Sequence, residues 1–342
     1  MYRAAFYFKP VAMKAVICRK YGPPEVLEMR EMATPVPKPD ELLIRIFAAT
    51  VTSGDGRVRS LSLPPGFGPL GRLALGIMGP RQPVLGTELA GEVVQTGSAV
   101  TNFRVGDRVF AFPGFRMGCH AEYRCVAATG PVAKIPPNLS YEQAAGLCFG
   151  GSTMLDFYRR GALASGERVL VNGASGGVGT AAVQLAKHFG AHVTAVCSTA
   201  NIEMVQSIGA DAVIDYTRED FMQGQHSFDM IVDTVGNAPF SRSGAALVPG
   251  GRLLMLVAGL ADLLAVPWTN LRSNKTIVAG PTQERAEYVR YMADLVAAGR
   301  FLPVIDRSFP FEQMVDAHRY VDQGHKRGNV VITFSNRSGK HA

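Results

Sequence analysis

One stretch of the chain, residues 167–187, constrains the fold more than any other. Its sequence, ERVLVNGASGGVGTAAVQLAK, runs from an apolar segment through a glycine-rich turn into a segment with helical apolar spacing. A buried parallel strand that enters a helix through such a turn is typical of a dinucleotide site. The small residues let the backbone approach a pyrophosphate, and the free N–H groups at the helix start favour its negative charge. We therefore predict a dinucleotide-binding unit here.

The alternative is a glycine-rich loop that only turns the chain. A second apolar run, HVTAVC at 192–197, follows at the spacing of a β-α-β unit, and this context favours the dinucleotide interpretation. The later predicted strands are 212–216, 228–234, 251–257 and 275–279. Six parallel strands with helices between them make a Rossmann-type, doubly wound α/β sheet. The apolar run that extends to residue 267 contains Gly, Asp and Pro, and we interpret it as a buried strand and loop.

The residues after the second strand indicate which dinucleotide is bound. NAD sites usually place Asp or Glu there to accept hydrogen bonds from the ribose, and Cys197–Asn201 contains no carboxylate. Small hydroxyl side chains such as Ser198 and Thr199 can donate to a 2′-phosphate, so we predict NADPH rather than NADH. The same hydroxyls could also cap the following helix. No Lys or Arg lies at 197–204 to pair with a phosphate, and Arg218 could serve instead.

Length and composition bound the rest of the molecule. A chain of 342 residues is long for one hydrophobic core and predicts two domains, and 47% hydrophobic residues indicate a globular protein. No apolar run is long enough for a membrane span. The net charge of +7 comes from scattered basic residues, which argues against nucleic acid and suits an anionic cofactor. Five cysteines without framework spacing, and no secretory signal, predict a cytoplasmic location, with the mitochondrion as the alternative.

Residues 13–137 follow a different pattern from the rest of the chain. Short alternating segments separated by Pro and Gly predict an all-β, barrel-like domain there. Within it, residues 57–83 form a long apolar stretch rich in Gly and Pro, which predicts either a lid over an apolar pocket or ordinary core around a short helix at 71–77. The elements expected at the C-terminal end are helix 284–298, helix 311–323 and strand 328–334.

Six strings of the sequence together carry a family resemblance. They are MKAVICRKYGPPEVLEM (13–29), PVLGTELAGEVVQTG (83–97), VGDRVFAF (105–112), NGASGGVG (172–179), VDTVG (232–236) and GHKRGNVVI (324–332). From residue 13 to residue 334, the chain resembles the zinc-independent quinone oxidoreductase (zeta-crystallin-like) branch of the medium-chain dehydrogenase/reductase superfamily.

The resemblance implies a two-domain architecture. Residues 13–137 and 282–334 would form a GroES-like β-barrel domain, and residues 138–281 a Rossmann NADPH-binding domain inserted into it. Residues 1–12 and 335–342 would be tails. The family also implies that the cofactor lies in the cleft between the domains and that the protein is a homodimer.

The resemblance also bears on metal binding. Zinc-dependent members of the superfamily carry His where this chain has Thr87, and a threonine hydroxyl is a poor zinc ligand. Cys119, His120 and Cys125 could be considered as ligands, but a fourth is missing. We therefore predict no metal site, and a zinc-type alcohol dehydrogenase is the alternative enzyme that Thr87 disfavours.

Without a metal Lewis acid, hydride transfer to an already activated acceptor remains feasible, and quinones and α,β-unsaturated carbonyls are such acceptors. The resemblance implies that Ser53 lies near the nicotinamide and donates a hydrogen bond to the acceptor or the ribose. The alternative for Ser53 and Asp55 is a turn held by side-chain to backbone bonds. Because no proton donor can be named, an NADPH-binding regulatory or structural protein without turnover is the alternative from another class.

We expect the cofactor to be held by the glycine turn and by the residues that follow the later strands. The resemblance adds contacts from one helix and from the C-terminal segment. The complete predicted set is Thr153, Ala174, Ser175, Gly176, Gly177, Val178, Gly179, Ser198, Thr199, Asn201, Tyr216, Thr234, Val235, Val257, Ala258, Lys326 and Asn329.

Overall fold

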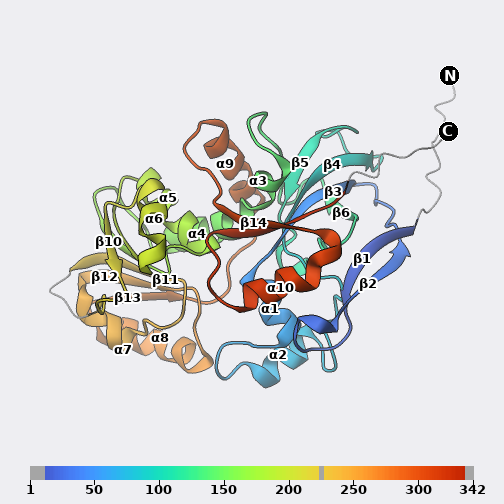
Figure 1. Ribbon diagram of the computed structural model, residues 1–342. Helices are drawn as coiled ribbons and strands as arrows, with labels where there is room; N and C mark the ends of the chain where they lie inside the picture. The colour runs from blue at the N-terminus through green and yellow to red at the C-terminus, as the bar shows by residue number, and fades with distance from the viewer. Residues whose placement is uncertain (1–11, 223–226, 336–342) are drawn as a thin grey trace.

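The computed structural model describes residues 12–222 and 227–335, so the tails predicted at 1–12 and 335–342 lie almost wholly outside the described residues. Figure 1 shows an α/β unit and a β-rich unit side by side. Within the described ranges no helix is both long enough and apolar enough to cross a bilayer.

The α/β unit is built on a six-stranded parallel sheet with the order β10-β9-β8-β11-β12-β13. The strands are β8 (Arg168–Asn172), β9 (His192–Cys197), β10 (Ala212–Asp215), β11 (Phe228–Asp233), β12 (Leu247–Met255) and β13 (Thr276–Ala279). The strand order reverses between β8 and β11, and in open α/β sheets ligands bind in the crevice at such a point. The predicted doubly wound sheet is confirmed.

Strand β8 shows why its sequence is apolar without alternation. Val169 and Val171 face one hydrophobic cluster together with α4 (Cys148–Arg160) and α5 (Gly177–His188), whereas Leu170 faces a second cluster on the other side of the sheet. All three side chains are fully buried. A parallel strand covered on both faces needs an apolar residue at every position, and this is the pattern that the sequence contains.

The β-rich unit is made from both ends of the described chain. Strands β1 (Ala12–Cys18) and β2 (Leu27–Ala33) form a separate antiparallel pair. The main sheet has the order β14-β15-β3-β4-β5-β7, and β6 also pairs with β3. Its strands are β3 (Glu41–Val51), β4 (Leu89–Thr96), β5 (Arg108–Ala111), β6 (Tyr123–Ala127), β7 (Val132–Lys134), β14 (Ile305–Pro310) and β15 (Asn329–Thr333). The predicted GroES-like unit beside the Rossmann sheet is confirmed.

The remaining helices connect and cover these sheets. They are α1 (Ser53–Ser60), α2 (Gly68–Leu75), α3 (Tyr141–Ala145), α6 (Ile202–Ser207), α7 (Phe240–Ser243), α8 (Leu260–Arg272), α9 (Ala286–Ala297) and α10 (Met314–Asp322). Because β14 and β15 both belong to the sheet that contains β3, the chain has returned from the α/β unit to the first domain at β14, before α10 (Figure 1).

Helix α8 corrects one sequence interpretation, since the apolar run up to residue 267 ends in an exposed helix and not in a loop. The backbone N–H of Gly259 donates to the Asp262 carboxylate (2.9 Å), which starts the helix. None of its residues is buried, and Leu264, Trp268 and Leu271 are all more than half exposed. Apolar composition indicated burial here, but the helix lies beside the edge strand β13 and its outer face has no cover from the described chain.

The glycine turn gives a test of the packing between β8 and α5. A Cβ on Gly179 would overlap the carbonyl oxygen of Gly173 and lie 2.8 Å from the carbonyl carbon of Ala174, so α5 would have to move away from the strand. We expect Gly179→Ala to lower the free energy of unfolding by about 3 kcal/mol, measured by urea unfolding. In the matched control Gly68→Ala the new Cβ meets nothing within 4 Å. Equal unfolding midpoints for the two variants would contradict this close packing.

Candidate functional site

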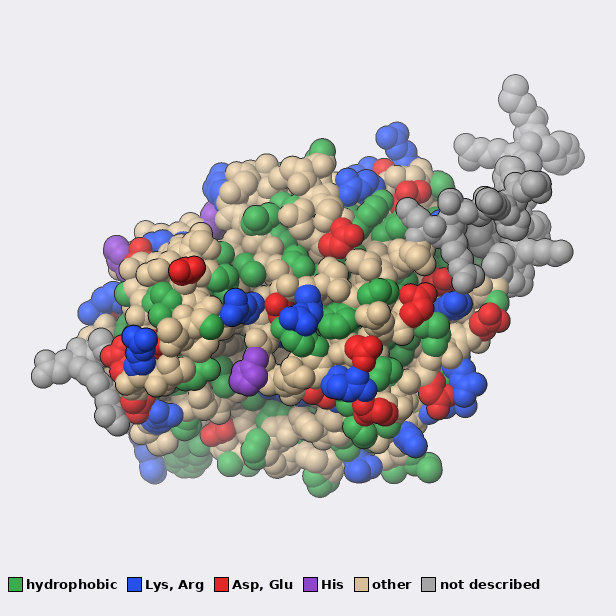
Figure 2. All heavy atoms as spheres, viewed as in Figure 1, with side chains coloured by type: hydrophobic (Ala, Val, Ile, Leu, Met, Phe, Trp, Pro, Cys, Tyr) green, Lys and Arg blue, Asp and Glu red, His purple; other side chains and the backbone are tan. Residues whose placement is uncertain are grey.

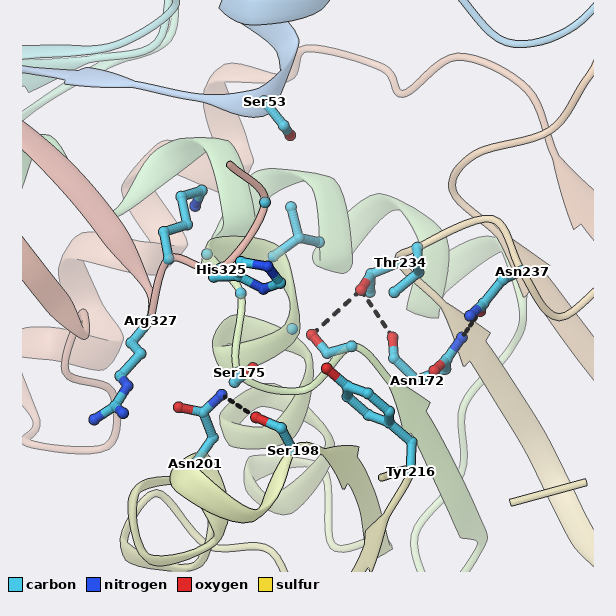
Figure 3. A pocket seen from close by; sticks show the side chains of 18 of the residues that line it. Ser53, Asn172, Ser175, Ser198, Asn201, Tyr216, Thr234, Asn237, His325 and Arg327 are labelled. Atoms are coloured by element: carbon cyan, nitrogen blue, oxygen red, sulfur yellow. Dashed lines mark hydrogen bonds between the residues drawn. The ribbon is translucent and has the colours of Figure 1, made fainter. Parts of the chain in front are cut away.

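A cavity of about 1050 Å³ lies at the carboxyl ends of the parallel strands, between the two units. Its wall comes from α1, the glycine turn, the segments after β9, β10 and β11, and the chain between α10 and β15 (Figure 3). The predicted site residues that the structure brings together on this wall are Ser53, Ser175, Gly176, Gly177, Val178, Gly179, Ser198, Asn201, Tyr216, Thr234, Val235 and Lys326.

The other predicted residues lie off the wall. Ala174 is fully buried. Thr199 donates its hydroxyl to the Asp215 carboxylate at 2.5 Å, so it supports the end of β10. Asn329 donates from Nδ2 to the carbonyls of Gly146 (3.2 Å) and Val304 (3.1 Å), and so ties the C-terminal segment to both. Three more predicted residues also lie off the wall: Thr153 is within α4, and Val257 and Ala258 follow β12.

The glycine turn offers the cavity a row of backbone N–H groups. Gly173 has a φ of +80°, a conformation that glycine adopts without strain, and the turn leads to Gly176 at the N-terminus of α5. No side chain caps this helix, so its first N–H groups are available to a ligand. A helix start of this kind, next to glycines that allow close approach, fits the pyrophosphate of a dinucleotide.

The C-terminal segment closes over the same turn. The backbone N–H of Gly328 donates to the carbonyl of Ser175 at 2.7 Å, and Gly176 and Gly328 form a parallel bridge. A Cβ on Gly177 would lie 2.8 Å from Oδ1 of Asn329 and 3.1 Å from Nζ of Lys326. Lys326 therefore lies beside the first turn of α5, where a bound phosphate would meet it.

A polar network after β8 and β11 was not predicted from the sequence. Asp233 is fully buried, and its carboxylate accepts hydrogen bonds from the N–H groups of Val235 (3.1 Å), Gly236 (2.9 Å) and Ala238 (3.0 Å). Asn172 donates to the same carboxylate at 2.9 Å. Asp233 thus shapes the loop that places Thr234 and Val235 on the wall. The signal in the sequence was the VDTVG string, in which the acid ends a buried strand.

Arg327 is the second functional residue that sequence reasoning missed. It lines the cavity and lies, in Figure 3, on the side of Asn201 and Ser198, with His325 between it and Thr234. Within the described chain its guanidinium pairs with no carboxylate. Arg218, the cation proposed from sequence, also lines the cavity, where its Nε lies 3.5 Å from the Asp215 carboxylate. The basic run at 325–327 was visible in the sequence, but only the fold brings it beside the residues after β9.

The opposite end of the cavity contains Ser53, at the start of α1. Thr52 and Asp55 form a reciprocal cap: the N–H of Thr52 donates to Asp55 at 2.8 Å, and the N–H of Asp55 donates to the Thr52 hydroxyl at 3.1 Å. Asp55 also accepts from the N–H of Gly86 at 3.0 Å. Asp55 therefore makes the side-chain to backbone bonds of the alternative interpretation, whereas the Ser53 hydroxyl has no partner within the described chain and faces the cavity.

Glu88 fixes the wall next to Ser53. Its buried carboxylate accepts from the hydroxyl of Thr50 (2.6 Å) and from the N–H groups of Cys148 (3.0 Å) and Phe149 (2.7 Å) at the start of α4. Burial raises the pKa of Glu88 to about 7, while these three hydrogen bonds act in the opposite direction. Phe149, whose N–H binds this carboxylate, lines the cavity.

The residues near Thr87 do not fit a zinc site. The Thr87 hydroxyl is buried without a hydrogen-bond partner, and Nε2 of His120 is 2.9 Å from the carbonyl of Thr50. Cys119 is buried, which raises its pKa and favours the thiol over the thiolate that binds zinc. Within residues 12–222 and 227–335, no group of three or more His, Cys, Asp or Glu side chains is arranged to hold a metal ion.

The fold and the site define a two-domain protein of the dinucleotide-binding dehydrogenase and reductase class, and comparisons with known proteins agree. Residues 38–137 match the alcohol dehydrogenase GroES-like domain family, and residues 208–332 match the zinc-binding dehydrogenase family. The mitochondrial NAD(P)H oxidoreductase RTN4IP1 of Mus musculus is 32% identical to this chain, over 95% of the chain and 90% of that protein.

Two further similarities are informative. The chloroplastic NADPH-dependent alkenal/one oxidoreductase of Arabidopsis thaliana is 30% identical over 94% of this chain and 80% of that protein. The solved structure of the quinone oxidoreductase from Coxiella burnetii superposes with a TM-score of 0.83 at 29% identity, over 94% of this chain and 99% of that one. The chain belongs to the quinone oxidoreductase-like branch of the medium-chain dehydrogenase/reductase superfamily, as the sequence predicted.

Lys326 gives the site an expected pH dependence. Burial lowers its pKa from 10.5 to about 8, while the carboxylates of Glu88 and Asp306 act in the opposite direction. Below this pKa the ammonium attracts a phosphate, and above it the neutral amine does not. With NADPH as the probe, we expect affinity to fall by up to about tenfold per unit above pH 8, measured by calorimetry.

The matching variants separate Lys326 from other titrating groups. Lys326→Met is expected to bind NADPH more weakly at neutral pH and to lose this pH dependence. The control Lys38→Met alters an exposed lysine outside the cavity and is expected to keep the wild-type profile. An unchanged profile in Lys326→Met would contradict the role assigned to this ammonium group.

Proposed function

We propose that this protein is a metal-free oxidoreductase that uses NADPH to reduce a quinone or an α,β-unsaturated carbonyl compound. The observation that carries the proposal is the cavity itself, which joins an uncapped helix start at the glycine turn to a pocket end formed by Ser53 and Phe149. The relatives are named as NAD(P)H, alkenal/one and quinone oxidoreductases, which supports the same reaction class.

The proposed cofactor-binding residues would bind the phosphate groups of NADPH. The N–H groups at the start of α5 and the ammonium of Lys326 would bind the pyrophosphate. Ser198, Asn201 and Tyr216 lie together on the wall and carry hydrogen-bonding groups for a ribose 2′-phosphate, and Arg327 adds a positive charge on their side of the cavity. When bound, the nicotinamide supplies the hydride for the reduction.

The acceptor would lie at the Ser53 end. Reduction of a quinone or enone moves negative charge onto the acceptor's carbonyl oxygen, and the free hydroxyl of Ser53 can donate a hydrogen bond to that oxygen. Phe149 offers an apolar surface beside it, which excludes water from the reacting atoms. One further proton completes the reduced product, and solvent can supply it.

The direct test is NADPH oxidation in the presence of 1,2-naphthoquinone or a short enone, followed by absorbance of the reduced cofactor. We expect steady turnover that a metal chelator does not reduce, and a lower Michaelis constant for NADPH than for NADH. NADPH binding without turnover across a broad panel of acceptors would support the regulatory or structural alternative. Stoichiometric zinc together with alcohol oxidation would support the alcohol dehydrogenase alternative.

Arg327 gives the sharpest test of the preference for NADPH. A charge-assisted hydrogen bond to a phosphate contributes about 1.5–3 kcal/mol, so Arg327→Ala is expected to raise the Michaelis constant for NADPH by roughly ten- to a hundredfold. The constant for NADH, which lacks the 2′-phosphate, is expected to change little. Arg290→Ala, an exposed arginine on α9 outside the cavity, is the control. Equal effects of Arg327→Ala on both cofactors would refute the assignment.

Two further predictions accompany the proposed activity. The homodimer implied by the family is supported by the exposed apolar face of α8 beside the edge strand β13, because a second copy of the chain would cover this face.

The cytoplasmic location stays a prediction, and the two relatives described above carry mitochondrial and chloroplastic names.

A further inference from the structure

The apolar stretch between α1 and β4 has neither of the roles that its sequence suggests. Residues 61–81 do not line the cavity, so they do not form its lid. They contribute little to the core, because Gly71 is the one buried residue of α2 and Leu75 is only partly buried against the core of the β-rich unit. Four large apolar side chains of α2 and the turn after it are strongly exposed. Their exposed fractions are 51% for Leu70, 65% for Leu73, 70% for Ile77 and 86% for Met78. We call these four residues, with the exposed Arg72 and Arg81, the α2 surface.

The α2 surface is held in place by the protein and does not depend on a partner for its shape. The Tyr21 hydroxyl donates to the carbonyl of Gly76 at 2.7 Å, and the N–H of Arg81 donates to the carbonyl of Leu75 at 2.6 Å. The two guanidinium groups also bind backbone, Arg72 at Ile77 and Arg81 at Leu73, each at 2.8 Å. The exposed apolar tips are therefore presented on an ordered turn.

Basic side chains predominate around these tips, and Glu28 is an acid close enough to Arg19 and Lys20 to interact with both. No Asp or Glu occurs from residue 56 to residue 87, and neither Arg72 nor Arg81 pairs with a carboxylate of the described chain. Gly79 packs closely against the backbone of Arg19 and Lys20, whose exposed side chains add two more cations beside the surface. Figure 2 shows hydrophobic side chains along the lower edge of the molecule, where Figure 1 places α2, with Lys or Arg close by.

Exposed apolar side chains bordered by an excess of cations match the chemistry of an anionic lipid bilayer. The apolar tips enter the boundary between headgroups and acyl chains, and the cations bind the lipid phosphates. A second copy of the chain fits less well, because a two-fold contact places the same patch on both sides and would bring these four cations against their own counterparts. We propose that the α2 surface docks the protein on an anionic membrane surface.

This inference goes beyond the proposed activity and does not require it. The α2 surface is joined to the site through the chain, because α1, which supplies Ser53 and Arg57 to the cavity wall, is followed by the segment that contains α2.

The test is co-sedimentation of the purified full chain with vesicles of phosphatidylcholine and phosphatidylglycerol in about equal parts. We expect binding to these vesicles that weakens with salt, and little binding to phosphatidylcholine alone. The double variant Ile77→Ser with Met78→Ser is expected to lower the partition coefficient by roughly tenfold or more, because it removes the inserted apolar groups. Arg19→Gln with Lys20→Gln is expected to lower it about as much on the anionic vesicles.

The matched control is Val36→Ser with Val105→Ser, which removes two equally exposed apolar side chains elsewhere (77% and 61%) and is expected to bind vesicles as the wild type does. The thermal unfolding midpoint, followed by circular dichroism, serves as the folding check for every variant. Equal vesicle binding by the Ile77/Met78 variant and the wild type would overturn the proposal. So would a loss of oligomeric mass in that variant, by light scattering, without a loss of vesicle binding, because the surface would then join copies of the chain.

Discussion

The site depends on one close contact, between the C-terminal segment and the glycine turn at the start of α5. Gly328 donates its N–H to the carbonyl of Ser175, and Gly176 faces Gly328 in a parallel bridge. Both sides of the contact lack a Cβ, and one on Gly328 would overlap the carbonyl of Val304. Because the backbones approach this closely, the residues just before the first domain's final strand can reach a cavity whose floor is the Rossmann sheet.

The same contact decides the electrostatics of the cavity. Three carboxylates near its wall are engaged by local donors: Asp233 by backbone N–H groups and Asn172, Asp215 by Thr199 and Thr217, and Asp220 by Arg242 at 2.8 Å. These acids shape the loops after the strands. The C-terminal segment then adds Lys326 and Arg327, whose charges remain available to a ligand. The balance favours an anionic ligand such as a phosphorylated dinucleotide.

The sequence predicted those parts of the fold that local patterns determine. The strand, glycine turn and helix at 167–187 need only neighbouring residues, and a doubly wound sheet of six parallel strands follows from repeated β-α-β units. Arg327 was missed because it lies more than a hundred positions from Ser198 and reaches its side of the cavity through the pairing of β15 with β3. The sequence predicted burial for the run that ends in α8, and either a lid or core for the segment that contains α2. Both segments are exposed, because apolar composition indicates a surface that a partner can cover but does not identify the partner.

The region around Thr87 supports the cavity wall through Glu88. Glu88 follows Thr87 directly, and its carboxylate binds the hydroxyl of Thr50 and the first N–H groups of α4, where the helix dipole also favours negative charge. Since those N–H groups belong to Cys148 and Phe149, the carboxylate sets the position of the Phe149 ring on the cavity wall. The acid next to Thr87 therefore holds the part of the cavity wall that contains Phe149. With Ser53 as the polar group at that end, the pocket suits an acceptor whose own conjugation spreads the incoming charge onto oxygen.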